Sequence, residues 1–170
     1  IFFRKILLPL ILMYVFVLPL VLRFLPLQKI YFGYKFTLSE IVYIWVSGAV
    51  TMLLVVNVLL KNMWGRARPN DVSYFNGFQD FTPWYKISDA CSSNCSFVSG
   101  DSSVGFFLIV FYFITKKNAY LYLGLILGSL LGFIRIAAGG HFFSDIIFSQ
   151  IVVTVTILVS FVLYKKFYDK

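Results

Sequence analysis

Charged side chains are scarce in this sequence: Asp, Glu, Lys and Arg account for 13% of the 170 residues, whereas hydrophobic residues account for 60%. A soluble domain of this length cannot bury so much apolar surface, because a small domain leaves a large part of its surface in water. The apolar residues also form long runs, and about 20 consecutive apolar residues span a bilayer as a helix. We therefore predict an integral membrane protein.

Acidic side chains are outnumbered by basic ones, seven against 15, which gives a formal net charge of +8. Such an excess can indicate nucleic-acid binding, but most of these Lys and Arg residues lie at the ends of apolar runs, where they anchor membrane helices. The sequence contains no basic and aromatic motif of a nucleic-acid-binding module. We therefore predict membrane lipids, and no nucleic acid, as partners.

Five apolar segments are separated by short turns and by one long polar stretch, 61–100. The segments cover residues 6–27, 39–60, 103–115, 119–137 and 143–164. They predict an all-α integral membrane fold: a bundle of five transmembrane helices, or six if another precedes residue 1. The aromatic residues of 61–100 suit a membrane–water interface, so we expect an interfacial loop within a single domain, 1–170.

Alternation of the helices places the loop 61–100 on one side of the membrane and most lysines on the other. The lysines of the second side are Lys29, Lys35, Lys116, Lys117, Lys165, Lys166 and Lys170. The positive-inside rule makes that side cytoplasmic, so the loop is expected to face the periplasm of a bacterial inner membrane. Arg4 and Lys5 disagree, which implies either a sixth helix or a proline-broken first segment that does not cross simply.

Cysteine and histidine are nearly absent, with two Cys and one His in the chain. Cys91 and Cys95 are four residues apart in the polar loop, close enough on one helical turn for a disulfide, which fits an oxidising compartment. Two unpaired thiols are the alternative. A single His argues against a zinc site, which takes four ligands drawn from Cys, His and carboxylates.

Two short polar segments border membrane helices and suit anion binding. Lys61 ends the second apolar segment and Arg68 follows seven positions later; an Arg fork fits phosphate oxygens, and Lys adds a point charge. Ser99 and Gly100 precede the third segment, where the free backbone N–H groups of a helix start favour an anion. The alternatives are a basic helix end at the headgroups and an ordinary N-cap by Ser99 or Asp101.

A third polar segment contains the only histidine of the sequence. His141 and Asp145 are four residues apart, so they share one face of a helix. A carboxylate beside an imidazole fixes its tautomer and leaves the other ring nitrogen as a nucleophile. Gly139 and Gly140 allow a tight turn that brings Arg135 to the same place. A purely structural His is the alternative, but all three segments fall on one membrane face and together predict a phosphoryl-transfer site.

The three segments resemble the signature motifs of the phosphatidic acid phosphatase type 2 superfamily. Those motifs read Lys-x6-Arg-Pro, Pro-Ser-Gly-His and Ser-Arg-x5-His-x3-Asp. The first is complete here and ends at Pro69, whereas Val98 and Asp101 replace the Pro and His of the second, and Ile134 replaces the Ser of the third. The resemblance covers residues 61–145 and is specific, because three separate motifs match.

The resemblance implies a mechanism without metal or cofactor, in which His141 attacks phosphorus, forms a phosphohistidine and is oriented by Asp145. The phosphate oxygens would be bound by Lys61, Arg68, Ser99, the Gly100 N–H and Arg135. Asp101 occupies the place of the residue that protonates the leaving oxygen. Either a protonated carboxyl does that work or the site is an inactive form that only binds phospholipid.

The run 94–100 followed by an acidic residue resembles a bacterial branch associated with lipid A phosphatases. We therefore expect a phosphorylated lipid as substrate, hydrolysed as a phosphate monoester at the periplasmic face, with lipid A first. Phosphatidylglycerophosphate and undecaprenyl pyrophosphate are the alternatives within this class. The sequence leaves the oligomeric state open.

Overall fold

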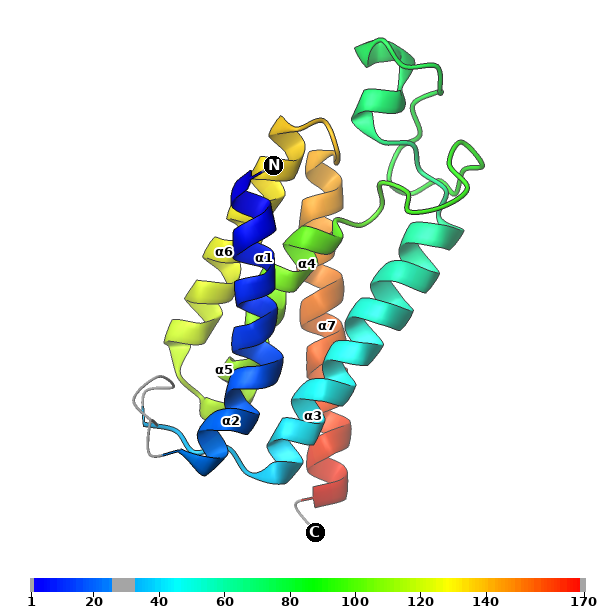
Figure 1. Cartoon of the computed structure of the whole chain (residues 1–170). Helices are drawn as coiled ribbons and strands as arrows, with labels where there is room; N and C mark the ends of the chain where they lie inside the picture. Colours follow the sequence, from blue (N-terminus) through cyan, green and yellow to red (C-terminus); the bar gives the residue numbers. More distant parts are fainter. Residues whose placement is uncertain (1, 26–32, 169–170) are drawn as a thin grey trace.

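The computed structural model describes residues 2–25 and 33–168 (Figure 1), and over these ranges every regular element is a helix. The first rod consists of α1 (Phe2–Leu12), the π-helical η1 (Met13–Val17) and α2 (Leu18–Phe24). The second rod consists of α3 (Leu38–Gly48) and the π-helical η3 (Ala49–Asn62). The central rod consists of α4 (Gly100–Phe106), η6 (Phe107–Ile109) and α5 (Val110–Thr115), followed by α6 (Asn118–Ala137) and α7 (Phe143–Tyr168). The predicted all-α fold is confirmed.

Four stretches are long and apolar enough to cross a membrane: Lys5–Phe24, Leu38–Asn62, Asn118–Ala137 and Phe143–Tyr168. The fifth predicted segment is shorter, Gly100–Thr115, and at 1.5 Å per residue its length is about 24 Å, less than the ~30 Å hydrocarbon core. It is also the most enclosed rod, since residues 106–111 are no more than 1% exposed. Four of the five expected spans therefore meet the length criterion, and a sixth stays a prediction.

The second rod starts at residue 38 because the preceding residue caps it. The Thr37 side chain accepts the Glu40 N–H, and the Glu40 carboxylate accepts the Thr37 N–H at 2.8 Å, so two backbone donors of the first turn are satisfied. The rod continues to Asn62, so Lys61 lies in its last turn, at the end of the helix where the sequence places it.

Small residues let the central rod pack closely against α6. Gly124, Gly128 and Gly132 are spaced by four on α6, the small-xxx-small pattern of membrane helix pairs. A Cβ added to Gly128 would lie 2.3 Å from the Phe106 ring, and one added to Gly105 would lie 2.6 Å from the Gly128 Cα. This close contact fixes the start of α4 relative to the end of α6.

The loop after η3 and the α6–α7 turn lie at one end of the bundle, together with the N-terminus (Figure 1). The opposite end carries the α5–α6 connection and the C-terminal end of α7. Of the lysines predicted to be cytoplasmic, Lys35, Lys116, Lys117, Lys165 and Lys166 belong to that opposite end, whereas Lys29 and Lys170 lie outside the described residues, as do 26–27 of the first apolar segment. Lys5 is on the loop side, so its disagreement with the expected topology persists.

The loop 63–99 is held to the bundle at its C-terminal part. It contains two short 3-10 turns, η4 (Pro69–Asp71) and η5 (Ser73–Phe75), and a disulfide between Cys91 and Cys95 with a Cα–Cα distance of 5.7 Å. Phe97 and Val98 are buried against Val56 of η3, and the Phe97 ring stacks on Trp64 at 4.9 Å. These contacts hold residues 96–99, the last part of the loop, against η3.

Candidate functional site

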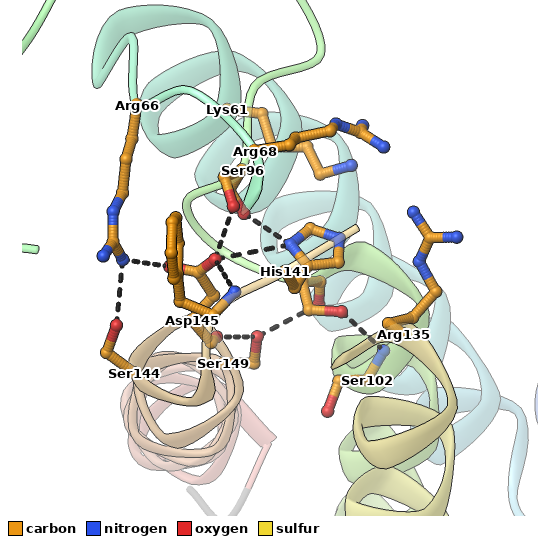
Figure 2. A network of polar contacts seen from close by, with 12 residues as sticks. Lys61, Arg66, Arg68, Ser96, Ser102, Arg135, His141, Ser144, Asp145 and Ser149 are labelled. Atoms are coloured by element: carbon orange, nitrogen blue, oxygen red, sulfur yellow. Dashed lines mark hydrogen bonds and ion pairs between the residues drawn. The ribbon is translucent and has the colours of Figure 1, made fainter. Parts of the chain in front are cut away.

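The three polar segments singled out in the sequence meet at the loop end of the bundle (Figure 2). Lys61 and Arg68 come from the end of η3 and the loop that follows it. Arg135 comes from the last turn of α6, His141 from the α6–α7 turn and Asp145 from the first turn of α7. Tertiary folding therefore brings together side chains that are far apart in the chain.

His141 is buried at 2% exposure, and its tautomer is set by the backbone. The ring nitrogen Nδ1 lies 2.7 Å from the Ser96 carbonyl oxygen. Because a carbonyl only accepts hydrogen bonds, Nδ1 carries the hydrogen, and in the neutral ring the lone pair is then on Nε2. We had assigned this orienting contact to Asp145, but its Oδ2 lies 3.6 Å from Nδ1, an ion-pair distance rather than a hydrogen bond.

Asp145 is fully buried and receives three hydrogen bonds. Its Oδ1 lies 2.6 Å from Nη1 of Arg66, and its Oδ2 accepts the Ser96 hydroxyl at 2.5 Å and the Phe142 N–H at 2.8 Å. Arg66 is thus part of the site, although the sequence reasoning gave it no role. The available signal was a third basic residue between Lys61 and Arg68 that does not end a helix.

Lys61 and Arg68 are both anchored to Asn94, a loop residue that the sequence reasoning did not single out. Lys61 Nζ donates to the Asn94 side-chain oxygen at 3.0 Å, and Arg68 Nη2 donates to the Asn94 carbonyl at 2.7 Å. Asn94 has a φ of 49°, in the left-handed region, and precedes the disulfide-bonded Cys95. Asn94, next to the disulfide, therefore holds both basic side chains in place.

The cations lie close enough to His141 to influence its ionisation. Burial lowers the pKa of His141 below its ordinary value, and the positive charges of Arg135 and Lys61 lower it further, against the opposing effect of the Asp145 carboxylate. The imidazole therefore stays neutral to lower pH than an exposed one. Figure 2 shows Lys61, Arg68 and Arg135 around the side of the ring that faces away from Asp145.

Ser99 and Gly100 form the start of α4. Ser99 is buried and caps the helix, since its hydroxyl accepts the Ser102 N–H at 3.4 Å, as the N-cap alternative predicted. Gly100 lies directly under Lys61: a Cβ added there would be 3.3 Å from the Lys61 Nζ. The structure thus places this glycine beside the cations.

Asp101 lies in the first turn of α4 and forms an ion pair with Arg135, with 3.5 Å between Oδ2 and Nε. Both side chains are partly buried, at 12% and 17% exposure. An ion pair requires the ionised carboxylate, whereas a proton donor has to carry a proton. The ion pair and proton donation therefore require different protonation states of Asp101, which lies next to the candidate phosphate ligand Arg135.

The α6–α7 turn is bound to the loop by one residue, Asn70. The Asn70 backbone N–H donates to the Gly139 carbonyl at 3.1 Å, and its side-chain amide donates to the Ala138 carbonyl at 3.1 Å. Gly139 has a φ of +65°, and a Cβ there would lie 1.8 Å from the Asn70 side chain. Glycine is therefore required for this contact.

Replacing Gly140 with Ala is expected to weaken the binding of inorganic phosphate by roughly tenfold while leaving the melting temperature nearly unchanged. The new Cβ would lie 2.4 Å from Nη2 of Arg135, so the flexible guanidinium must move from its place beside His141. Phosphate titration and thermal unfolding in detergent measure the two effects. Ser129→Ala, an exposed change on α6, is the control; a stability loss in Gly140→Ala without weaker phosphate binding would contradict the expectation.

Among the described residues, no group of three or more His, Cys, Asp or Glu side chains is arranged to hold a metal ion. The expectation of a metal-free site stays a prediction.

The fold and the site define a helical membrane protein whose histidine is buried beside three basic side chains at one end of the bundle. The chain belongs to the PAP2 superfamily, whose family model matches residues 41–169. The resemblance predicted from the three motifs is confirmed.

Three curated relatives carry the name Lipid A 4'-phosphatase. The protein of Francisella tularensis subsp. novicida (strain U112) is 42% identical over 121 residues, which cover 69% of this chain and 53% of that protein. The proteins of Rhizobium leguminosarum and Rhizobium etli (strain ATCC 51251 / DSM 11541 / JCM 21823 / NBRC 15573 / CFN 42) are each 35% identical, over 56% and 55% of this chain and 42% and 38% of their own lengths. The chain thus matches about half or less of each relative. No solved structure matches it significantly.

Proposed function

We propose that this protein is a membrane lipid phosphatase that removes a phosphate monoester from lipid A, with the 4'-phosphate as the first candidate. The observation that carries the proposal is the setting of His141: Nδ1 is bound to the Ser96 carbonyl, and the rest of the ring faces Lys61, Arg68 and Arg135. A neutral nucleophile beside three cations suits attack on a phosphate dianion, because the cations offset its charge as the reaction proceeds.

In the first step Nε2 of His141 attacks phosphorus, the N–P bond forms and the lipid O–P bond breaks. The bonding electron pair leaves with the lipid oxygen, which takes a proton from Asp101 when that carboxyl is protonated. The phosphorylated imidazole is positively charged, and the Asp145 carboxylate behind it, 3.6 Å from Nδ1, stabilises that charge. In the second step a water oxygen attacks phosphorus, the N–P bond breaks, a water proton returns to Asp101, and inorganic phosphate leaves.

A lipid substrate is supported by the surroundings of the site. A cavity of about 490 Å³ adjoins His141 and is lined mainly by apolar groups, among them Phe75, Ile136 and Phe143. Such a cavity can receive the apolar or sugar part of a lipid, whereas free phosphate needs no apolar wall. The names of the three relatives favour lipid A among phosphorylated lipids.

The side of the membrane is proposed from the distribution of basic residues, and the disulfide of the loop agrees with it. The end of the bundle opposite the site carries Lys35, Lys116 and Lys165 among others, which by the positive-inside rule favours a cytoplasmic position for that end. The site then faces the periplasm of a bacterial inner membrane. The Cys91–Cys95 disulfide, which lies in the loop at the site, is in keeping with an oxidising compartment.

An inactive phospholipid-binding protein is the second candidate, favoured by the Asp101–Arg135 ion pair. A carboxylate committed to Arg135 would support phosphate binding by holding that side chain, but it would not protonate a leaving group. This candidate predicts binding of phosphorylated lipids without phosphate release.

A panel of phosphorylated lipids in detergent separates these candidates. We expect release from lipid A at the 4'-position to exceed release from phosphatidylglycerophosphate and undecaprenyl pyrophosphate by about tenfold or more in kcat/KM, since the substrate's non-reacting part sets specificity. Mass spectrometry of the lipid product identifies the position that is cleaved. Release from none of these lipids, together with measurable binding, would contradict the phosphatase proposal and support the binding protein.

A further inference from the structure

A buried ion pair joins Arg66 of the loop to Asp145 at the start of α7; Asp145 belongs to the third sequence motif, whereas Arg66 occupies a position of the first motif at which no residue type is specified. Arg66 Nη1 is 2.6 Å from the Asp145 Oδ1, and the two side chains are 3% and 0% exposed. Opposite charges in such contact and out of water interact strongly, and each offsets the field of the other at nearby groups. The nearest ionisable neighbour of this pair is His141, 3.6 Å from the other carboxylate oxygen.

Arg66 is held by contacts with the loop and with the start of α7. Its Nε donates to the Thr82 carbonyl at 2.8 Å, and its Nη1 also donates to the Ser144 hydroxyl at 2.8 Å. The guanidinium carbon lies 4.1 Å from the centre of the Phe142 ring. Figure 2 shows Arg66 on the far side of Asp145 from Arg135, so the other cations and Arg66 flank the Asp145–His141 pair on opposite sides.

The carboxylate of Asp145 is thereby fixed in one orientation. Arg66 holds Oδ1, while the Ser96 hydroxyl and the Phe142 N–H hold Oδ2 at 2.5 and 2.8 Å. The same Ser96 offers its carbonyl to His141 Nδ1 at 2.7 Å. Ser96 therefore links the two groups, because its hydroxyl binds the Asp145 carboxylate and its carbonyl binds the His141 imidazole.

We propose that Arg66 is a positioning residue of this site, which locks the Asp145 carboxylate behind His141 and offsets part of its negative charge, so that the imidazole stays neutral with Nε2 available for attack. The catalytic consequence rests on the proposed function. The charge offset at His141 does not, and it is measurable without turnover.

The sign of the effect follows from the charges around the imidazole. The groups that surround it from the neighbouring elements are Asp145, Arg66, Lys61, Arg68, Arg135 and, through its pair with Arg135, Asp101. Removing Arg66 takes away a positive charge and leaves the negative charge of Asp145 without its offset. Both changes favour the imidazolium form, so the pKa of His141 rises. Since the neutral ring is the nucleophile, the acid limb of kcat/KM moves to higher pH.

The single histidine of the chain makes the test direct, because the imidazole NMR signal of histidine-labelled protein in detergent reports His141. We expect Arg66→Met to raise its titration midpoint by about one pH unit relative to wild type. Lys86→Met removes the same charge from an exposed position of the same loop and is expected to leave the midpoint in place. An unchanged midpoint in folded Arg66→Met, or an equal shift in Lys86→Met, would overturn the inference.

A second variant covers the case in which Arg66→Met does not fold. Arg66→Met/Asp145→Asn removes both buried charges together, which spares the protein an unpaired buried ion. Its His141 midpoint is expected to lie below that of wild type but above that of Asp145→Asn alone, because the carboxylate, 3.6 Å from Nδ1, acts on the imidazole more strongly than the more distant Arg66. A midpoint no higher than that of Asp145→Asn would contradict the charge offset.

Phosphate release measured on the same samples separates this inference from the proposed function. If wild type releases no phosphate but Arg66→Met shifts the titration, the phosphatase proposal fails and the positioning of Asp145 by Arg66 stands. If wild type releases phosphate and Arg66→Met leaves both the titration and the acid limb unchanged, the inference about Arg66 fails alone.

Discussion

Replacing His141 with Gln is expected to lower phosphate release about a thousandfold or more, because the proposed reaction loses its nucleophile. The Gln amide can still donate to the Ser96 carbonyl that now accepts from Nδ1, so the fold should persist. Lys61, Arg68 and Arg135 also remain, and the affinity for the phosphorylated lipid should change little. Phosphate release and lipid binding, measured on the same preparation, give the two quantities.

A covalent intermediate provides the internal control for this variant. Wild type that is quenched during turnover of a labelled phospholipid should carry phosphate that is labile to acid and stable to alkali, as expected of a phosphohistidine. The sequence contains no second histidine, so peptide mapping should place the phosphate on His141. Turnover by His141→Gln at a rate near that of wild type, or phosphate mapped to another residue, would refute the nucleophile.

Replacing Asp101 with Asn is expected to have the second largest effect, and its size should depend on the leaving group. If Asp101 protonates the leaving oxygen, release from a lipid alkyl phosphate should fall by about 10²- to 10⁴-fold, whereas release from an aryl phosphate, whose leaving group needs little protonation, should fall far less. Parallel kinetics on the two substrates measure this difference. Asp101→His tests the same role from the other direction, because it should retain more activity than Asp101→Asn.

An equal loss on both substrates would assign a different role to Asp101. The carboxylate lies 3.5 Å from the Arg135 Nε, so its removal also releases the side chain that we propose as a phosphate ligand, and that effect is independent of the leaving group. Asp89→Asn, which removes an exposed carboxylate from the loop, is the matched control and should leave both rates unchanged. The ratio of the two losses thus decides between proton donation and the positioning of Arg135.

The sequence by itself determined the class of the fold and predicted most of the side chains that the structure brings together at the site, but not Arg66 or Asn94. Long apolar runs have few physical outcomes other than membrane helices, since a polar backbone in lipid must satisfy its own hydrogen bonds. The positions of the motifs likewise predicted that Lys61, Arg68, Arg135 and His141 lie at one end of the bundle, because the alternation of helices fixes which helix ends are on the same side of the membrane. The same reasoning counted residues 103–115 as one of five transmembrane helices, whereas the rod Gly100–Thr115 is shorter than the other four and enclosed, since apolar content does not distinguish a lipid-facing helix from an enclosed one.

Only the tertiary structure decided how the histidine is held. Four-residue spacing brings His141 and Asp145 near each other, but the acceptor for Nδ1 is a backbone carbonyl of Ser96, and every residue has a carbonyl. The partner of Asp145 is Arg66, which lies 79 positions away in the chain. A buried carboxylate requires a counter-charge, and only folding shows which cation is excluded from water together with it. The site proposed from sequence as a histidine backed by a carboxylate is therefore, in the structure, a histidine oriented by the backbone and a carboxylate held by an arginine.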